Sequence, residues 1–351
     1  MLNKVIMLIF LFLSIVLSVF AEDQPMLRIS NYGDYISLET LNKFSRIYNI
    51  HIIYDTQDTN ETILKKLADG NKEGYDLVIL SSPITESLIK QNMLEPLDKS
   101  KLPNFKNLSP EHINQYFDPN NKYSVPYYWG TIGIIYDSDR IKKITRWSDL
   151  WNRSLKNNVL ISNEYADVFP MVLKSLGYSA NSMKTNEIEQ AYEQLNKLML
   201  NAVMLKTGNT ASQFVREGLM AGMVFSGDAV LITSKRHNYK YIYPEEGALK
   251  WMDNMLILKS SKNKDTAHKF INFILDAENS AELAKVIGYG LPNRAGYNLL
   301  SEKDKKNNII YPDINMLKNS EIIKNTSPVD ELKQKYWKMF KSAYDKFKSE
   351  L

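Results

Sequence analysis

The chain has 351 residues, of which 44% are hydrophobic and 24% are charged, and its net charge is +4. This composition is typical of a globular protein, and the length predicts two domains of ordinary size. The absence of cysteine excludes disulfides, thiolate metal sites, a thiol nucleophile and a lipid-modified N-terminal cysteine. Lysines are spread along the chain rather than clustered, so nucleic acid is not an expected partner.

Residues 1–21 have the layout of a secretory signal peptide. Lys4 precedes an uncharged apolar run of sixteen residues, and Ala21 stands at the expected cleavage site. A membrane span needs about 20 apolar residues, so an uncleaved membrane anchor is the alternative interpretation. We therefore expect export to the periplasm.

Strand-like and helix-like runs alternate in the first part of the chain. We predict strands at Met26–Ser30, Ile50–Tyr54 and Leu77–Leu80, with helices at Thr40–Tyr48 and Asn60–Ala68 between them. In the first helix, the spacing of Leu41, Phe44 and Ile47 predicts one buried face. The β-α-β-α-β order predicts a parallel sheet with helices on both faces.

The alternation returns later in the chain. The predicted elements are a strand at Val159–Ser162, helices at Val168–Leu176, Glu187–Leu200 and Ala211–Met220, a strand at Gly222–Phe225, and a helix at Thr266–Leu275. A last helix is predicted to begin with Ser327 as its N-cap and Pro328 at its first position, with an apolar stripe that packs on the body. Two extended segments, Tyr128–Gly133 and Asp253–Leu256, are the candidate crossings between two lobes that close by a hinge.

Catalytic and metal-binding motifs are largely absent from the sequence. The four histidines do not stand at metal-ligand spacing, and there is no nucleophile elbow and no phosphate-binding glycine loop. The Ser-x-x-Lys pattern at Ser87–Lys90 lacks the motifs that accompany it in acyl-enzymes. Adjacent Tyr127 and Tyr128 leave a ferric-ion site open as an alternative, although aromatic residues in such a crossing segment are more simply core or cleft wall.

Carboxylates and aromatic residues stand together in several predicted turns. The four carboxylate turns are Tyr32–Tyr35, Glu164–Asp167, Phe225–Asp228 and Trp251–Asp253, and Gly288–Gly290 adds a tyrosine. Most of them follow predicted strands, and ligands of α/β folds bind at the carboxyl ends of strands. Carboxylates pair with ammonium groups, whereas aromatic faces attract cations and cover methylenes. The pattern predicts a linear cationic ligand with an apolar middle.

The chain resembles the spermidine/putrescine periplasmic binding proteins over essentially all residues after the signal peptide. The segments that carry this resemblance stand in the family's order: Tyr75–Val78, Leu97–Leu102, Phe117–Asn121, Val125–Gly130, Trp147–Trp151, Leu176–Ser179, Trp251–Asp253 and Ile287–Asn293. The resemblance implies the α/β fold of periplasmic binding proteins type II, with two lobes, each with a central mixed sheet, linked by hinge crossovers. It also implies that lobe 1 is 22–130 plus 254–297 and lobe 2 is 131–253 plus 298–351.

The same resemblance implies the function and the ligand residues. The protein is expected to be a monomeric receptor, not an enzyme, that needs no cofactor or metal and delivers a polyamine to the permease subunits of an ABC importer. The implied ligand residues are Tyr32, Asp34, Tyr35, Ser81, Glu164, Asp167, Phe225, Asp228, Trp251, Asp253 and Tyr289. Within this set, Glu164 and Asp167 match an acidic pair that holds an amine, and Asp253 would bind an ammonium or a central amine.

Several residues depart from the family's pattern. Tyr32 and Phe225 replace tryptophans, Pro83 replaces a tyrosine, and Ile323 stands near a glutamine position of the spermidine receptors. Asp228 matches an aspartate of putrescine receptors where spermidine receptors carry a serine, which favours putrescine. The alternatives are a receptor of the same fold for ferric ion or a cationic amino-acid derivative, and a signalling or adhesion protein that has kept the fold.

Overall fold

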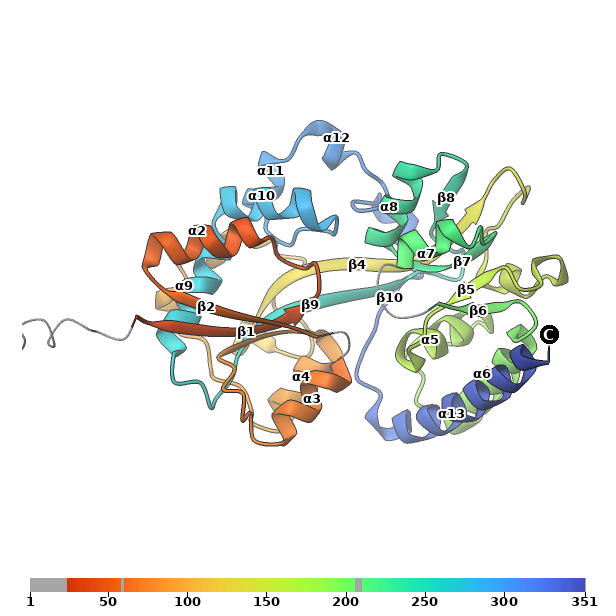
Figure 1. The fold of residues 1–351 in the computed structure, drawn as a ribbon, viewed down its shortest axis with the longest axis horizontal. Helices are drawn as coiled ribbons and strands as arrows, with labels where there is room; N and C mark the ends of the chain where they lie inside the picture. Colours follow the sequence, from red (N-terminus) through yellow and green to blue (C-terminus); the bar gives the residue numbers. More distant parts are fainter. Residues whose placement is uncertain (1–23, 58–59, 206–209, 351) are drawn as a thin grey trace, which may run out of the picture.

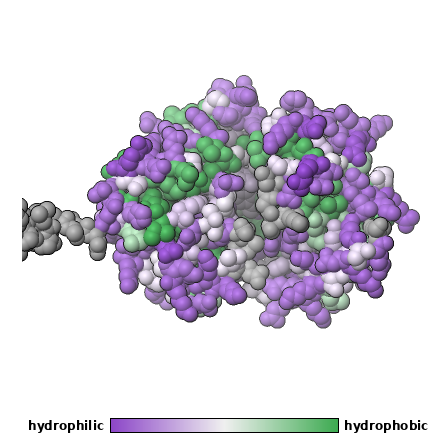
Figure 2. All heavy atoms as spheres, viewed as in Figure 1, coloured by the Kyte–Doolittle hydropathy of each residue, from purple (hydrophilic) through white to green (hydrophobic). Residues whose placement is uncertain are grey.

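The computed structural model describes residues 24–57, 60–205 and 210–350. The predicted signal peptide lies outside these ranges. Within them, no helix is both long enough and apolar enough to cross a membrane. Figure 1 shows two lobes joined by long strands that run from one to the other. Hydrophilic side chains cover most of the face shown in Figure 2, and smaller hydrophobic patches lie on both lobes.

Lobe 1 contains the first three strands, which run parallel, as the sequence predicts; their order in the sheet is β2-β1-β3. The strands are β1 (Met26–Tyr32), β2 (His51–Gln57) and β3 (Leu77–Ser81). The helices of this lobe are α2 (Leu38–Tyr48), α3 (Asn60–Ala68), α4 (Ser82–Lys90), α9 (Lys264–Ile274), α10 (Ala277–Ile287) and α11 (Arg294–Leu299). They lie on both sides of the strands (Figure 1), which confirms the predicted layering.

The buried face of α2 differs from the prediction at one position. Leu41 and Phe44 are buried as expected, but Ile47 is 59% exposed. The reason is the position of α9, because its Phe273 packs against the rings of Phe44 and Tyr48. Tyr48, one residue later than predicted, therefore takes the contact that Ile47 was expected to make.

Lobe 2 contains β5 (Val159–Ile161), β6 (Ala202–Met204), β7 (Ala221–Phe225) and β8 (Tyr239–Ile242). Its helices are α5 (Tyr165–Ser175), α6 (Thr185–Leu198), α7 (Thr210–Arg216), α8 (Ser226–Lys235) and α13 (Ser327–Ser349). Helix α13 packs on α5 and α6, where its Tyr336 stacks on Tyr192 with ring centroids 4.4 Å apart. The predicted N-cap of α13 is wrong by one residue, because Thr326 has the non-helical cap conformation and Ser327 is already helical.

The strands β4 (Ser124–Asp137) and β9 (Leu249–Ile257) run antiparallel to each other through both lobes. The segments predicted as crossings lie within these two strands. At one end β9 pairs with β3 of lobe 1, and at the other β4 pairs with β7 and β8 of lobe 2. The two expected sheets are therefore joined into one hydrogen-bonded sheet with the order β2-β1-β3-β9-β4-β7-β5-β6.

A third connection between the lobes follows α11. It contains α12 (Glu302–Lys305) and β10 (Glu321–Ile322), which pairs with β9 before α13 begins. Short 3-10 turns occur here and elsewhere, at Lys99–Lys101, Pro103–Asn107, Pro119–Asn121, Trp147–Trp151, Arg153–Leu155 and Ile314–Leu317.

Each lobe has its own hydrophobic core. The core of lobe 1 includes Val125 and Phe270, and the core of lobe 2 includes Trp147 and Phe169. Trp251 of β9 is partly buried and packs against both cores. The seam between the lobes therefore runs through the part of β9 in which an aromatic residue and a carboxylate were predicted to bind a ligand.

Candidate ligand-binding cleft

Five of the predicted ligand residues form a row of aromatic rings across the seam between the lobes. Tyr32 contacts Tyr35 with ring centroids 5.7 Å apart, and Tyr35 contacts Tyr289 at 5.8 Å. Tyr289 contacts Trp251 at 4.9 Å, and Trp251 contacts Phe225 at 6.0 Å. The row begins at the end of β1 in lobe 1 and ends at the last residue of β7 in lobe 2. We call it the aromatic row.

Two glycines allow the central ring of the row to take its place. Gly288 ends α10 in the left-handed conformation, with φ of 75°, which favours glycine. Tyr289 then lies against Gly227 in the first turn of α8, where a Cβ atom would stand 2.5 Å from the tyrosine ring. The phenol of lobe 1 and the backbone of lobe 2 are therefore in direct contact.

Asp253 lies beside the aromatic row at the seam between the lobes and is 7% exposed. It stands on β9 opposite Ser81 of β3, and the Tyr35 hydroxyl donates a hydrogen bond of 2.9 Å to its Oδ2 atom. Burial raises the pKa of Asp253 to about 7, and the hydrogen bond from Tyr35 partly offsets this rise. Among the described residues, no lysine or arginine forms an ion pair with this carboxylate. A buried carboxylate without a cation suits a ligand that brings one.

Two further carboxylates lie on the lobe 2 side. Asp167 is in the first turn of α5, and the Ser162 hydroxyl donates to its Oδ2 atom at 2.8 Å. Burial raises the pKa of Asp167 to about 6. Asp228 is in the first turn of α8, where burial raises its pKa to about 6 and a backbone hydrogen bond from Ala211 opposes the rise.

The negative charges of the three carboxylates raise the pKa values of two tyrosines in the aromatic row. Burial is the largest cause of the raised pKa of Tyr32, and the negative charges of Asp253 and Asp167 raise this pKa further. Burial likewise raises the pKa of Tyr289, with additional contributions from Asp228 and Asp253. Asp253 thus acts on both tyrosines, Asp167 on Tyr32 and Asp228 on Tyr289. This arrangement offers several anionic positions separated by aromatic rings.

Three other predicted residues lie around this centre. Ser81 ends β3, and its hydroxyl accepts a hydrogen bond from the Asn60 side chain at 3.4 Å. Asp34 is exposed and adopts the left-handed conformation, with φ of 56°, in the turn after β1. Glu164 is exposed at the residue that precedes α5, and its charge adds to the rise in the pKa of Asp167.

Sequence reasoning missed residues that hold the cleft side chains in place. Asn60, at the start of α3, accepts a hydrogen bond of 2.6 Å from the Tyr32 hydroxyl. Tyr127 donates to the Tyr35 carbonyl at 2.6 Å. Asn60 could have been found from its position, because it opens a helix beside the carboxyl ends of β1 and β3. Tyr127 could not, because nothing local indicates its contact with a residue 92 positions earlier.

The two tyrosines considered as iron ligands pack in the hydrophobic core of lobe 1. Tyr127 and Tyr128 are 3% and 1% exposed and belong to the core of lobe 1. In the part of the chain that the structure describes, no group of His, Cys, Asp and Glu could hold a metal ion.

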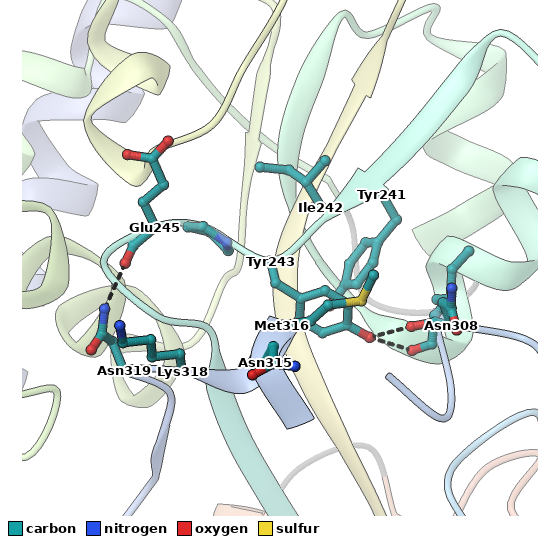
Figure 3. Close-up of a pocket in the computed structure, with 11 residues that line it drawn as sticks. Tyr241, Ile242, Tyr243, Glu245, Asn308, Asn315, Met316, Lys318 and Asn319 are labelled. Atoms are coloured by element: carbon teal, nitrogen blue, oxygen red, sulfur yellow. Dashed lines mark hydrogen bonds between the residues drawn. The ribbon is translucent and has the colours of Figure 1, made fainter. Parts of the chain in front are cut away.

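A cavity of about 500 Å³ lies elsewhere, between the end of β8 and the third connection. Figure 3 shows Tyr243 in its wall, with its hydroxyl donating to the backbone carbonyls of Asn308 and Ile309. Tyr241 and Met316 also line it. None of the predicted ligand residues is among its lining residues, so we do not assign the ligand to it.

Comparison with known proteins identifies the family of the chain. A family model described as a bacterial extracellular solute-binding protein matches residues 39–312. The spermidine/putrescine-binding periplasmic protein of Salmonella typhimurium is 37% identical over 325 residues, which cover 92% of this chain and 93% of the relative. The chain belongs to the spermidine/putrescine-binding family of extracellular solute-binding proteins.

A second relative and a solved structure also match most of the chain. The putrescine-binding periplasmic protein of Escherichia coli K12 is 30% identical, with 92% of this chain and 93% of the relative covered. A putative spermidine/putrescine ABC transporter structure from Listeria monocytogenes is 34% identical, with a TM-score of 0.84 and coverage of 90% of this chain and 98% of that one. These findings confirm the predicted family and fold class, and the relatives are binding proteins rather than enzymes.

Proposed function

We propose that this protein is the receptor of an ABC importer and captures a polyamine in the cleft between its lobes. The observation that carries the proposal is the buried carboxylate of Asp253, which accepts a hydrogen bond from Tyr35 beside the aromatic row and, among the described residues, forms no ion pair with a lysine or arginine. The names of the relatives support a polyamine as its ligand.

The chemistry of the cleft suits a linear polyamine. Its ammonium groups would pair with Asp253 and with the carboxylates of Asp167 and Asp228. The rings between them would cover the methylenes, at about 0.8 kcal/mol for each buried CH₂ group, and would attract the cations by about 0.5–2 kcal/mol for each contact. A ligand that touches both lobes favours their closed arrangement.

We further propose that putrescine is preferred. Asp228 supports this preference, because it provides a carboxylate near Tyr289 at the position where the resemblance associates aspartate with putrescine receptors. Tyr32 and Phe225 stand in the aromatic row where the family carries larger tryptophans, and the affinities for putrescine and spermidine test which polyamine this row prefers.

The remaining features follow from the same proposal. The chain would be exported through residues 1–21, act as a monomer in the periplasm and deliver its ligand to the permease subunits. The proposed lobe boundaries are 22–130 plus 254–297 and 131–253 plus 298–351; the two cores support this division along β4 and β9, whereas Leu300 packs in the core of lobe 1.

Calorimetric titration with putrescine, cadaverine, spermidine and spermine tests the proposal, with a cationic amino acid as comparison. Wild-type protein should bind at least one polyamine, and Asp253→Asn should abolish the binding. A matched control is Asp265→Asn, which removes an exposed carboxylate that pairs with Lys101 on the outside of lobe 1. The absence of heat and of any melting shift with all four polyamines would refute the proposal.

The preference has its own test. Asp228→Ser should weaken putrescine binding more than spermidine binding, because a diamine loses one of its two ionic partners and a triamine keeps two. An unchanged ratio of the two affinities would show that Asp228 does not determine the preference.

A further inference from the structure

A short segment before α13 is fastened to lobe 2 at both ends. We call residues 321–326 the strap. At its start, Glu321 pairs with Nζ of Lys174 at 2.9 Å, and this lysine on α5 is 7% exposed. At its end, the Thr326 hydroxyl accepts a hydrogen bond of 2.7 Å from Lys333 of α13, which is 3% exposed. Both anchors are buried, so the strap moves with lobe 2.

The middle of the strap contacts lobe 1. Nζ of Lys324 lies 4.8 Å from the ring centroid of Tyr116. The side chain of Asn325 donates a hydrogen bond of 3.4 Å to the Pro83 carbonyl in the first turn of α4. Figure 1 shows this part of the chain descending from β10 beside α4 before it enters α13.

The strap and α4 flank the part of β9 that carries the ligand residues. The backbone N–H of Ile323 donates to the Lys250 carbonyl at 2.8 Å. From the lobe 1 side, the Ser82 hydroxyl donates to the Met252 carbonyl at 2.9 Å. These two bonds stand on either side of Trp251. The contact between strap and lobe 1 therefore lies at the margin of the proposed cleft.

We infer that the strap is a ligand-independent contact that holds the lobes in their binding arrangement, with Tyr116 and Lys324 as positioning residues. The inference rests on the proposed function. Apparent affinity is the intrinsic affinity multiplied by the fraction of protein in the competent arrangement. Because Tyr116 and Lys324 are both exposed, a cation–π contact between them changes the equilibrium between the arrangements by about twofold to fivefold, and the competent fraction by at most that factor. The factor is the same for every ligand, because no ligand takes part in the contact.

The charge of Lys324 and its contact with Tyr116 have opposite effects on polyamine affinity. A lysine at the margin of the cleft repels a cationic ligand, so removal of its charge would by itself tighten polyamine binding. Loss of the contact with Tyr116 acts in the opposite direction. A weaker affinity after Lys324→Met therefore identifies the contact rather than the charge as the dominant effect.

The experiment compares Lys324→Met, Tyr116→Leu and their double variant with wild type. The matched control is Lys122→Met, which removes a cation–π contact of similar length, 5.0 Å to the Tyr123 ring, within lobe 1 alone. Calorimetry measures the affinity for putrescine and spermidine, and small-angle X-ray scattering measures the radius of gyration without ligand.

We expect each single variant to weaken the binding of both ligands by the same factor, of about twofold to fivefold, and to increase the radius of gyration. The double variant should be no weaker than the weaker single variant, whereas Lys324→Arg and the control should match wild type. Unchanged or tighter binding by Lys324→Met, or unequal factors for the two ligands, would overturn the inference. If wild type binds no polyamine, the proposed function fails, and the scattering comparison alone decides the role of the strap.

Discussion

Polyamine affinity should fall as the pH falls from 8 to 6. The pKa of Asp253 is raised to about 7 and those of Asp167 and Asp228 to about 6, all mainly by burial. Ammonium groups bind the ionised carboxylates, whereas aliphatic amines with pKa values near 10 keep their charge throughout this range. Protonation of the carboxylates therefore competes with the ligand.

The size of the effect follows from these pKa values. If all three carboxylates ionise on binding, the association constant falls about twofold between pH 8 and pH 7 and about fortyfold between pH 8 and pH 6. Binding then releases about 0.7 proton at pH 7 and about 1.9 protons at pH 6. Calorimetric titration in two buffers of different ionisation enthalpy measures both quantities.

A matched variant separates the carboxylates. Asp228→Ser should lower the proton release at pH 6 by about 0.5, because that group is half protonated there. An affinity that is constant between pH 8 and pH 6, or a proton release that Asp228→Ser leaves unchanged, would refute the reasoning.

The unliganded protein should respond to pH in the opposite direction. The folded-state pKa of Asp253 is raised above its ordinary value of 3.8. Its contribution to stability is therefore fully present below about pH 4 and is lost as the pH rises through 7. The melting temperature without ligand should fall between pH 5 and pH 8, while the stabilisation by polyamine should grow, and thermal denaturation curves with and without ligand measure the two trends.

Three further predictions concern single side chains. Tyr35→Phe removes the hydrogen-bond donor to Asp253 and should weaken polyamine binding by about tenfold or more at pH 8, since a hydrogen bond to a charged group is worth about 1.5–3 kcal/mol. Calorimetry measures this loss. The control is Tyr243→Phe, whose hydroxyl lies in the separate cavity of lobe 2 (Figure 3). Gly227→Ala places a Cβ atom 2.5 Å from the Tyr289 ring, so it should weaken binding and lower the melting temperature. Asp253→Asn should raise the melting temperature of the unliganded protein at pH 8 but not at pH 4. The rise in the pKa of Asp253 from 3.8 to about 7 limits the gain in free energy of unfolding to about 4 kcal/mol.

The periodicity of the sequence predicted the strands β1, β2, β3, β5 and β7 and seven of the helices, but it did not predict α4, α8, α10 or the edge strands β6 and β8. It failed where a tertiary contact chose between neighbouring residues. Ile47 and Tyr48 are both apolar residues in the last turn of α2, and only the position of Phe273 decides which one packs. Ser327 carries a cap-forming side chain, yet the backbone places Thr326 at the cap, where its hydroxyl accepts from Lys333.

The cleft was predictable in composition but not in arrangement. Asp253 and Trp251 could be proposed from their position in a candidate crossing and from the family resemblance. The order of rings from Tyr32 to Phe225 could not, because it depends on side-chain directions in four separate segments of the chain. The hydroxyl that holds Asp253 comes from Tyr35, 218 positions away in the chain, and no local pattern indicates so distant a partner.

Because β9 passes through both lobes, we expect few substitutions of its cleft residues among members of the family. Trp251 and Asp253 belong to the strand that joins the lobes, so a substitution there would affect the joining of the lobes as well as the proposed ligand contacts. Positions at the ends of other elements, such as Tyr32 and Phe225, carry no such double role. Both of these positions depart from the family's pattern, whereas the pair on β9 keeps it. Changes of ligand preference in this family are therefore expected to accumulate at the ends of strands and helices, while the residues of the joining strand are retained.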